Sequence, residues 1–488
     1  MRALTKSVIL ITIFAVLTRG IGFIFRVILS RILSPEMLGI YQTAMSVFMV
    51  LLTVIASGIP FVISRAVANK PKDQQTLIKT GFITSLVVAV SLCVLVFLCA
   101  PLLKFVFANE ACAPILFALL PAIVLSSVYT VLRAVWWGER RFVLLGTTEL
   151  IEQVARVLLF IAFLGLFSGI LSDVSITAWS FTAANVVSAA VVAILFLKLN
   201  KLSREKFSPQ KSDYKNLIKS ALPITGVRLI TSATFPLISI LLPFRLIAIG
   251  YSSAEALALF GVFAGMAMPL LSVPATVVSA LATALVPDLS NGFENNKREF
   301  LFRQTLSSLK FSIFINFLFV PIFIAMGNGL GLFLFDNAAA GGFIRAGAIT
   351  VVFMGIAQIS STVLNSLKQE KRASINFLFG SIALFFCVLF LPRFVGGYCI
   401  IIGMLMSAVI TSILNIKSIE KLYGRKFFRD ILGHFLKLTT ICCVLIILGQ
   451  NLFFVLLNFL PLFWTLGFSG ITLLGLFYWL CRVYKLVK

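Results

Sequence analysis

Long apolar runs separated by short polar segments repeat along the whole chain. A helix of about 18 or more apolar residues, rising 1.5 Å per residue, can cross a hydrocarbon core about 30 Å thick. By this criterion the pattern predicts an all-α polytopic membrane protein with about fourteen transmembrane helices. The expected spans are 7–32, 39–66, 80–103, 114–137, 146–167, 174–197, 218–243, 255–286, 306–332, 344–366, 375–392, 397–416, 434–457 and 462–481.

Composition agrees with this reading of the pattern. Apolar residues make up 60% of the chain and charged residues only 12%, about half of the charged share of a soluble domain. Most of the 41 lysines and arginines fall in segments on the side of the N-terminus. Because cytoplasmic loops have the excess of these residues, we expect a protein of the cytoplasmic membrane with both termini in the cytoplasm. The net charge of +24 then reflects topology, and no nucleic-acid partner is expected.

Two polar segments, 198–220 and 417–430, are longer than the other loops and divide the spans into groups of six, six and two. TVLRAVWWGER (130–140) is similar to TVLNSLKQEKR (362–372), and each ends the fourth span of its group. Such like-oriented repeats are typical of transporters that bind substrate between two halves. We predict three parts: a six-helix bundle at 1–200, a second bundle at 201–420, and two additional helices at 421–488.

Several ionisable residues fall within the predicted spans. A charge at the bilayer centre costs about 3 kcal/mol or more, so such residues usually face a bundle interior or a water-filled cavity. Arg19 and Arg228 lie too deep to reach either membrane surface, and we expect them in a cavity. Arg26, Arg65 and Arg133 are near enough to span ends for their side chains to extend to water.

Glu149, Glu152 and Arg156 are spaced three and four residues apart, so they can contact one another on one helix. The spacing fits a pair that neutralises itself, and it equally fits a carboxylate that responds to protons or contacts substrate. Serines and threonines also recur on one face of single spans, as at Ser57 and Ser64. These hydroxyls can line a polar cavity or simply mediate helix packing.

An arginine-lined cavity favours an anionic ligand. The guanidinium group stays charged, and its planar fork matches phosphate. A lipid-linked pyrophosphate saccharide meets this requirement, because its polyprenyl chain can stay in the bilayer. The chain has no P-loop motif, one histidine (His434) and no C-x-x-C pair among its eight cysteines. We therefore predict no enzyme activity, no cofactor and no metal site.

Six motifs resemble one known family in the same order along the chain. They are LTRGIGFIFRVILSRIL, LGIYQTA, SGIPFVISRAVA, SSVYTVLRAVWWGERR, ELIEQVARV and SALATALVPDLS. Together they resemble the stage V sporulation protein B and polysaccharide biosynthesis family of the multidrug/oligosaccharidyl-lipid/polysaccharide exporter superfamily, which is related to the lipid II flippases. The resemblance implies two pseudo-symmetric six-helix bundles with two extra helices.

The resemblance also implies roles for individual residues. By position, Arg19, Arg26, Arg65 and Arg228 match cavity arginines that hold the pyrophosphate in the related flippases. The pattern of the fourth and fifth spans transfers to Arg133, Glu152, Gln153 and Arg156, and Glu149 joins these as a further candidate for a cavity or coupling role. One departure is that Arg133 is followed by Ala134 and two tryptophans where relatives have R-G-Y-F-Q-G.

The sequence thus predicts a flippase that moves a lipid-linked saccharide, of the peptidoglycan-precursor type, across the membrane by alternating access. Its expected partners are that lipid-linked pyrophosphate saccharide, membrane lipids and cell-wall synthesis enzymes. One alternative is a scaffold that recruits cell-wall or spore-cortex synthesis enzymes without transporting anything. Another is a drug or cation antiporter on the same fold, which the excess of intramembrane arginines over glutamates disfavours.

Overall fold

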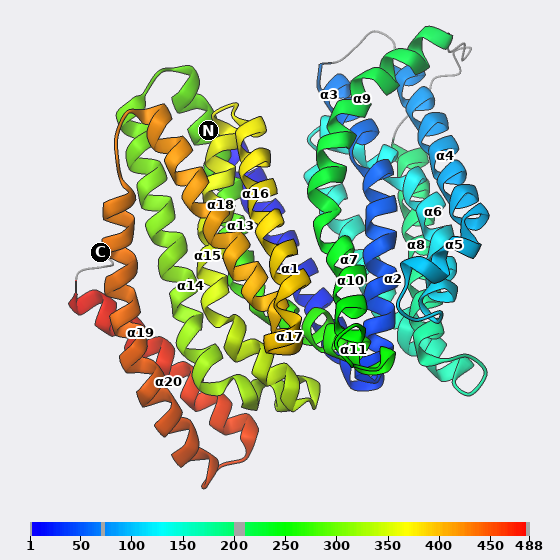
Figure 1. Cartoon of the computed structure of the whole chain (residues 1–488). Helices are drawn as coiled ribbons and strands as arrows, with labels where there is room; N and C mark the ends of the chain where they lie inside the picture. Colours follow the sequence, from blue (N-terminus) through cyan, green and yellow to red (C-terminus); the bar gives the residue numbers. More distant parts are fainter. Residues whose placement is uncertain (1, 70–73, 200–209, 485–488) are drawn as a thin grey trace. The chain divides into compact units, whose positions relative to one another are not determined.

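The computed structural model describes residues 2–69, 74–199 and 210–484, and the side chains of 13–69, 75–199 and 210–484 among them. All of the named secondary structure in these residues is helical (Figure 1). In the described part of the chain, 15 helical stretches are long and apolar enough to cross a membrane. The chain is therefore a multi-pass α-helical membrane protein, as the sequence predicts.

The chain forms two compact units. Unit 1 comprises Met1–Ile247 and Tyr251–Gly261, and unit 2 comprises Ala248–Gly250 and Val262–Lys488. The helices of unit 1 are α1 (Arg2–Ile32), α2 (Pro35–Ala56), α3 (Gly58–Ala68), α4 (Gln74–Leu98), α5 (Ala100–Val106), α6 (Cys112–Gly138), α7 (Phe142–Phe167), α8 (Asp173–Leu199), α9 (Lys211–Ser232), α10 (Thr234–Ile247) and α11 (Ser253–Gly261). The predicted boundaries at residues 200 and 420 remain predictions.

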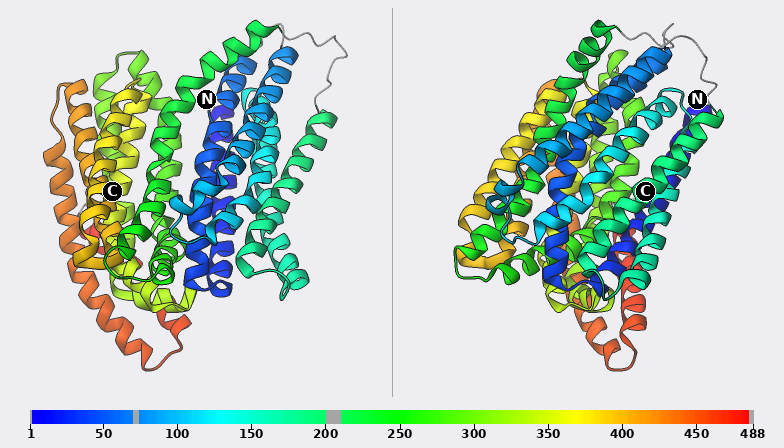
Figure 2. Two further views of the ribbon diagram at one scale, coloured as in Figure 1. Left: turned by 45° about the vertical axis from the view of Figure 1, so that its right-hand side comes forward. Right: turned by 90° about the vertical axis from the view of Figure 1, so that its right-hand side faces the viewer.

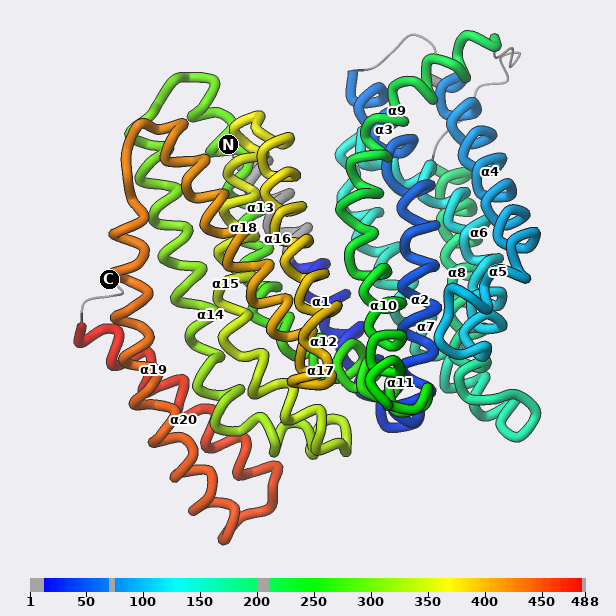
Figure 3. Tube along the Cα trace, in the orientation of Figure 1, coloured from blue at the N-terminus to red at the C-terminus, as the bar shows by residue number. Residues whose placement is uncertain are grey.

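The first helical element of unit 2 is a buried π-helix at Val262–Ala267. Its other helices are α12 (Met268–Leu271), α13 (Val273–Glu294), α14 (Arg298–Phe335), α15 (Ala338–Ser366), α16 (Glu370–Phe390), α17 (Pro392–Val395), a 3₁₀ turn at Gly396–Tyr398, α18 (Cys399–Tyr423), α19 (Phe428–Leu457) and α20 (Leu462–Val483). Helices α14 and α15 run side by side (Figure 3). Helices α19 and α20 form a hairpin that packs against α14 (Figure 2).

Four predicted spans are interrupted: those at 80–103 and 218–243, at Cys99 and Ala233, and the two that follow. The span expected at 39–66 consists of α2 and α3, which are separated at Ser57. The span expected at 255–286 is separated at Ser272 into the apolar stretches Ser253–Leu271 and Val273–Glu294, which accounts for the additional candidate span. Pro274, in the first turn of α13, has no backbone N–H to continue a preceding helix and is well tolerated at a helix start. The apolar composition continues through the breaks at Ser57 and Ser272, so hydropathy did not reveal them.

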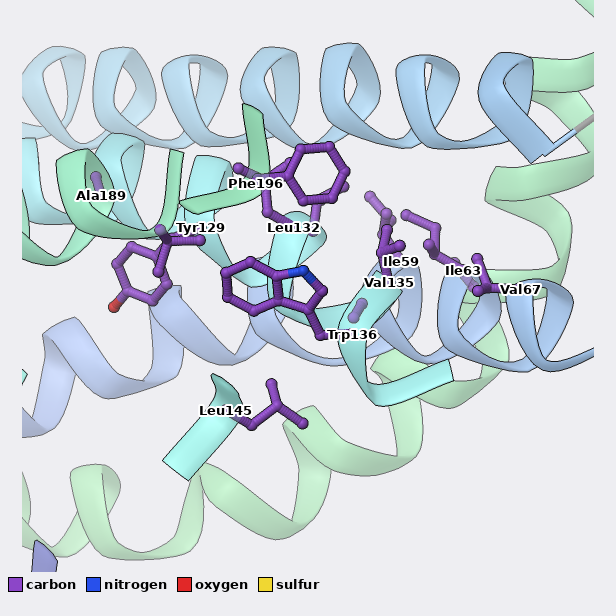
Figure 4. Close-up of a cluster of buried hydrophobic side chains, with 14 of the residues drawn as sticks. Ile59, Ile63, Val67, Tyr129, Leu132, Val135, Trp136, Leu145, Ala189 and Phe196 are labelled. Carbon is purple, nitrogen blue, oxygen red and sulfur yellow. The ribbon is translucent and has the colours of Figure 1, made fainter. Parts of the chain in front are cut away.

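An apolar cluster fixes the end of α6 in unit 1. Trp136 is fully buried and packs near Phe196 of α8, with ring centroids 6.2 Å apart. Ile59 and Ile63 of α3 and Leu145 of α7 belong to the same cluster (Figure 4). The cluster joins residues of five helices, α3, α6, α7, α8 and α9, so the neighbouring polar residues of α6 project from a rigid support.

The turns that follow α6 and α15 have the same geometry. Arg140 and Lys368 both adopt the left-handed conformation, with φ of 59° and 58°. In each turn the next residue donates its N–H to a carbonyl five residues earlier, Arg141 to Trp136 and Gln369 to Leu364, both at 2.9 Å. This geometry pairs Arg140 with Lys368, whereas the similarity of 130–140 to 362–372 pairs it with Arg372. The alignment by sequence and the alignment by turn geometry therefore differ by about one helical turn. Residues one turn apart lie on nearly the same face of a helix, so both alignments match similar helix faces.

Candidate functional site

An ionic cluster forms where α6, α7 and α8 meet in unit 1. Arg133 of α6 donates through both terminal nitrogens to one carboxylate oxygen of Glu152 on α7, at 3.2 Å each. Arg156, one turn further along α7, donates to the other oxygen at 3.1 Å. Ser188 of α8 accepts from Arg133 and donates to Glu152, both at 3.2 Å. One carboxylate thus holds two guanidinium groups, and the cluster keeps an excess positive charge.

Aromatic rings support both guanidinium groups of this cluster. Arg133 lies over the ring of Tyr129 and Arg156 over the ring of Phe181, at 4.7 and 4.6 Å from the ring centroids. The Tyr129 hydroxyl, which points away from Trp136 in Figure 4, donates to the Asn185 side chain at 3.0 Å. Cation–π contacts of this kind add to the attraction of the carboxylate and limit the movement of the arginines.

Arg133 also borders a pocket of about 290 Å³ in unit 1, which we call the polar pocket. Its lining residues come from α2, α3, α6, α7 and α9. They are Ala56, Ser57, Pro60, Phe61, Ser64, Thr130, Arg133, Ala134, Trp137, Leu145, Glu149 and Arg228, with Ser57 at the break between α2 and α3. The pocket combines two cations, one carboxylate, three hydroxyls and an indole ring. Such a mixture suits a ligand with both charged and neutral polar parts.

The structure separates the two glutamates of α7. The expected contact of Glu152 with Arg156 is present, but Glu149 is exposed, lines the polar pocket and has no acid–base partner among the described residues. Glu152 and Ser188 hold the Arg133 side chain at 14% exposure, at the edge of the polar pocket. The roles predicted for these residues remain predictions.

The four arginines predicted to bind substrate occupy different places in unit 1. Arg228 lines the polar pocket, and Arg65 lies on α3 directly after Ser64, which lines it. Arg19 and Arg26 lie on α1, which packs against α7. All four side chains are exposed. The structure thus brings together Arg228 with Arg133 and Glu149 around one pocket.

Gln153 lies toward α1, between the positions of its two arginines. A Cβ placed on Gly22 would be 3.8 Å from the Gln153 side-chain oxygen, and Gly22 is three residues after Arg19 and four before Arg26. These three residues share one face of α1. The arginine face of α1 is therefore directed toward α7, the helix that contains Glu149 and Glu152.

Sequence reasoning missed the partners that come from other helices. Ser188 and Asn185 of α8 had no spacing that linked them to Arg133, whereas Tyr129 lies four residues before Arg133 on α6, a spacing that allows their cation–π contact. The hydroxyl stripes were only partly informative: Ser57 donates to the carbonyl of Thr53 at 2.6 Å and is 3.4 Å from the Thr225 hydroxyl. The Ser57 hydroxyl lines the pocket and also donates its proton to the helix backbone. Ser57 therefore both lines a polar cavity and takes part in helix structure.

In unit 2, amides and hydroxyls join the corner where α15, α16 and α18 meet. Asn376 of α16 donates to Asn415 of α18 at 2.9 Å, and Asn415 donates to Ser360 and Ser361 of α15 at 3.1 and 2.9 Å. Ser361 precedes Lys368 by as many residues as Arg133 precedes Arg140. Unit 2 therefore joins its three helices with amides and hydroxyls where unit 1 uses ions.

Two curated relatives support the resemblance seen in the motifs. Stage V sporulation protein B of Bacillus subtilis (strain 168) is 24% identical over 393 residues, which are 77% of this chain and 75% of the relative. Sporulation protein YkvU of the same organism is 23% identical over 328 residues, 64% of this chain and 71% of the relative.

Solved transporter structures share the fold. The lipid II flippase MurJ in an inward closed conformation matches with a TM-score of 0.75 at 13% identity, covering 98% of this chain and 99% of that one. An inward-facing multidrug resistance MATE family transporter of the MOP superfamily matches with a TM-score of 0.68 at 16% identity, covering 85% and 94%. The family model for polysaccharide biosynthesis proteins matches residues 4–293, more than half of the sequence. The chain therefore belongs to the polysaccharide biosynthesis protein family and has the MOP-superfamily transporter fold.

Proposed function

We propose that this protein is a flippase that moves a lipid-linked saccharide of the peptidoglycan-precursor type across the cytoplasmic membrane. Membership of the polysaccharide biosynthesis family supports a saccharide substrate. The fold shared with a lipid II flippase supports transport of a lipid-linked molecule. Alternating access, in which the site opens to each side of the membrane in turn, is the mechanism common to transporters built from such repeats.

The observation on which the proposal mainly depends is that Arg228 and Arg133 line one polar pocket. Arg133 is already held by Glu152, whereas Arg228 has no carboxylate partner among the described residues. An unpaired guanidinium within a membrane helix is costly unless it meets water or an anion. A diphosphate would supply that anion and accept two hydrogen bonds from the Arg228 fork, while Arg133 adds positive charge to the same pocket.

The other predicted ligands extend the proposal. Arg19 and Arg26 on α1 and Arg65 on α3 would attract the diphosphate toward Arg228, while its polyprenyl chain stays among the lipids. Gln153, Glu152 and Arg156 would maintain the position of Arg133 rather than contact the ligand. No group in this arrangement is required to make or break a covalent bond, which is consistent with a transporter rather than an enzyme.

The test is flipping of a lipid-linked saccharide by the purified protein in vesicles, followed by the leaflet in which the saccharide can be modified by an added enzyme. We expect Arg228→Ala to lower the initial rate at least tenfold, since loss of a charge-assisted bidentate contact costs about 1.5–3 kcal/mol. Arg429→Ala, at an exposed arginine in the first turn of α19, should leave the rate unchanged.

Two outcomes would contradict the proposal. If the unmodified protein moves no lipid-linked saccharide but still binds synthesis enzymes, the scaffold alternative replaces it. If flipping proceeds equally in both variants, Arg228 is not a ligand and the proposed site is wrong.

A further inference from the structure

The two consecutive tryptophans of α6 have opposite environments. Trp136 is fully buried in the apolar cluster, whereas Trp137 is 54% exposed and lines the polar pocket. Phe142 at the start of α7 meets Trp137 edge to face, with centroids 5.6 Å apart and planes at 82°. The indole of Trp137 therefore presents a supported aromatic face at the wall of the pocket.

The charges of the pocket indicate a ligand that is more than a phosphate. Glu149 lines the same pocket as Arg133 and Arg228, and a carboxylate repels a phosphate close by. A carboxylate does, however, accept hydrogen bonds from the hydroxyl and amide groups of a sugar. Three hydroxyl-bearing residues, Ser57, Ser64 and Thr130, add further neutral partners.

A pyranose ring fits this combination. One face of the ring consists mainly of C–H groups and packs on a flat aromatic surface, while its hydroxyls point outward to polar partners. An indole offers a large rigid surface of this kind at little cost in conformational entropy. The pocket volume of about 290 Å³ is at the lower end for small-molecule sites, about 300–1,000 Å³, and suits one sugar.

We propose that Trp137 and Glu149 form a sugar subsite, in which the pyranose next to the diphosphate stacks on the indole and donates hydrogen bonds to the carboxylate. This inference rests on the proposed function and assigns the parts of the ligand: Arg228 and Arg133 contact the diphosphate, and Trp137 determines specificity for the saccharide. This chain has tryptophans after Arg133 where relatives have R-G-Y-F-Q-G, and the sugar subsite gives Trp137 a function at that position.

An exposed tryptophan in a membrane protein can also belong to the interfacial aromatic belt. Trp464 of α20 provides the matched control, because it is equally exposed at 54% and packs edge to face with Phe463, with centroids 5.2 Å apart. Trp464 does not line the polar pocket. If both tryptophans belong to the interfacial belt, substitution of either should have the same effect on ligand binding. If Trp137 forms a sugar subsite, only its substitution should change the binding of a sugar-bearing ligand.

The experiment measures binding of two short-chain probes to the purified full-length protein in nanodiscs: a polyprenyl diphosphate, and the same molecule with one N-acetylhexosamine. We expect the unmodified protein to bind the sugar-bearing probe about tenfold more tightly. Trp137→Ala should remove this preference and leave the affinity for the sugar-free probe unchanged. Trp137→Phe should retain most of it, and Trp464→Ala all of it.

The outcomes separate this inference from the proposed function. Equal binding of both probes to the unmodified protein, or a preference that survives Trp137→Ala, would overturn the sugar subsite alone. Failure of the unmodified protein to bind either probe would overturn the proposed function as well. If Trp137→Ala does not fold, Trp137→Leu keeps an apolar side chain without a ring and must show the same loss of preference.

Discussion

Glu149 and Glu152 lie less than one turn apart on α7, and their surroundings give them different roles. Glu152 accepts hydrogen bonds from two arginines and a serine, with only 12% of its side chain exposed. Glu149 faces the polar pocket and makes no ion pair or hydrogen bond among the described residues. The first carboxylate therefore stabilises the packing of α6, α7 and α8, and the second remains available to a ligand.

Replacement of these two residues should separate stability from binding. Glu152→Ala would leave Arg133 and Arg156 as unpaired, mostly buried cations, and we expect it to reduce the free energy of unfolding by about 3 kcal/mol. Glu149→Ala removes no ion pair and should change stability by less than about 0.5 kcal/mol. The unfolding midpoints of the purified variants in denaturant provide the comparison. Equal midpoints would show that the ionic cluster does not stabilise unit 1.

Residue spacing predicted one contact of this site and could not predict the others. The contact of Glu152 with Arg156 follows from their separation on a single helix, because residues four apart are neighbours there. The bonds of Arg133 to Glu152 and Ser188 depend on how three helices pack. The family pattern placed Arg133 and Glu152 together as candidates, but a single sequence contains no signal for Ser188.

At the scale of helices, one close approach fixes α11 in unit 1. Gly39 of α2 lies against the backbone carbonyl of Leu257 on α11, and a Cβ placed on Gly261 would be 2.9 Å from the Gly39 Cα. Only residues without side chains allow two helix backbones to approach so closely. The first part of the predicted span at 255–286 thus packs in unit 1, although the rest belongs to unit 2.

Alanine substitutions test this close approach. Gly261→Ala should separate α2 from α11 and destabilise the protein by about 1–3 kcal/mol, as overpacking usually does. Gly226→Ala on α9 has open space around its new Cβ, so it should be neutral or stabilising by up to about 1 kcal/mol. Thermal unfolding in detergent measures both. A Gly261→Ala variant as stable as Gly226→Ala would exclude tight packing of α2 on α11.

Hydropathy predicted the helices well because a membrane leaves few alternatives to long apolar helices. It could not show where a helix changes direction, since composition is the same on both sides of Ser57 and Ser272. Pro274 did offer a local signal, because proline favours the first turn of a helix. A bend inside α9, which contains Pro223, is visible in Figure 1 and has the same physical origin.

For the whole molecule, the exposed apolar side chains of both units suit contact with lipid. Examples are Leu98 at 75% exposure in unit 1 and Ile471 at 71% in unit 2. A soluble protein would not leave so many large apolar residues in water. The orientation of the spans is a separate question that only the distribution of lysine and arginine addresses, and both termini in the cytoplasm remain our prediction.

Reporter fusions check this orientation. Alkaline phosphatase is active only outside the cytoplasm, so we expect a fusion after Lys488 to be inactive and a green fluorescent protein fusion at the same position to fluoresce. A phosphatase fusion after Gly169, in the turn between α7 and α8, should be active. An active phosphatase at the C-terminus would reverse the topology or require an odd number of spans.

The matching turns at Arg140 and Lys368 bear on which polar side chains can be exchanged in each unit. The same turn geometry follows a helix that is joined to its neighbours by ions in unit 1 and by amides and hydroxyls in unit 2. We therefore expect that exchanging ions for amides at the corner of α6, α7 and α8 would keep the turn and change the charge at the wall of the polar pocket.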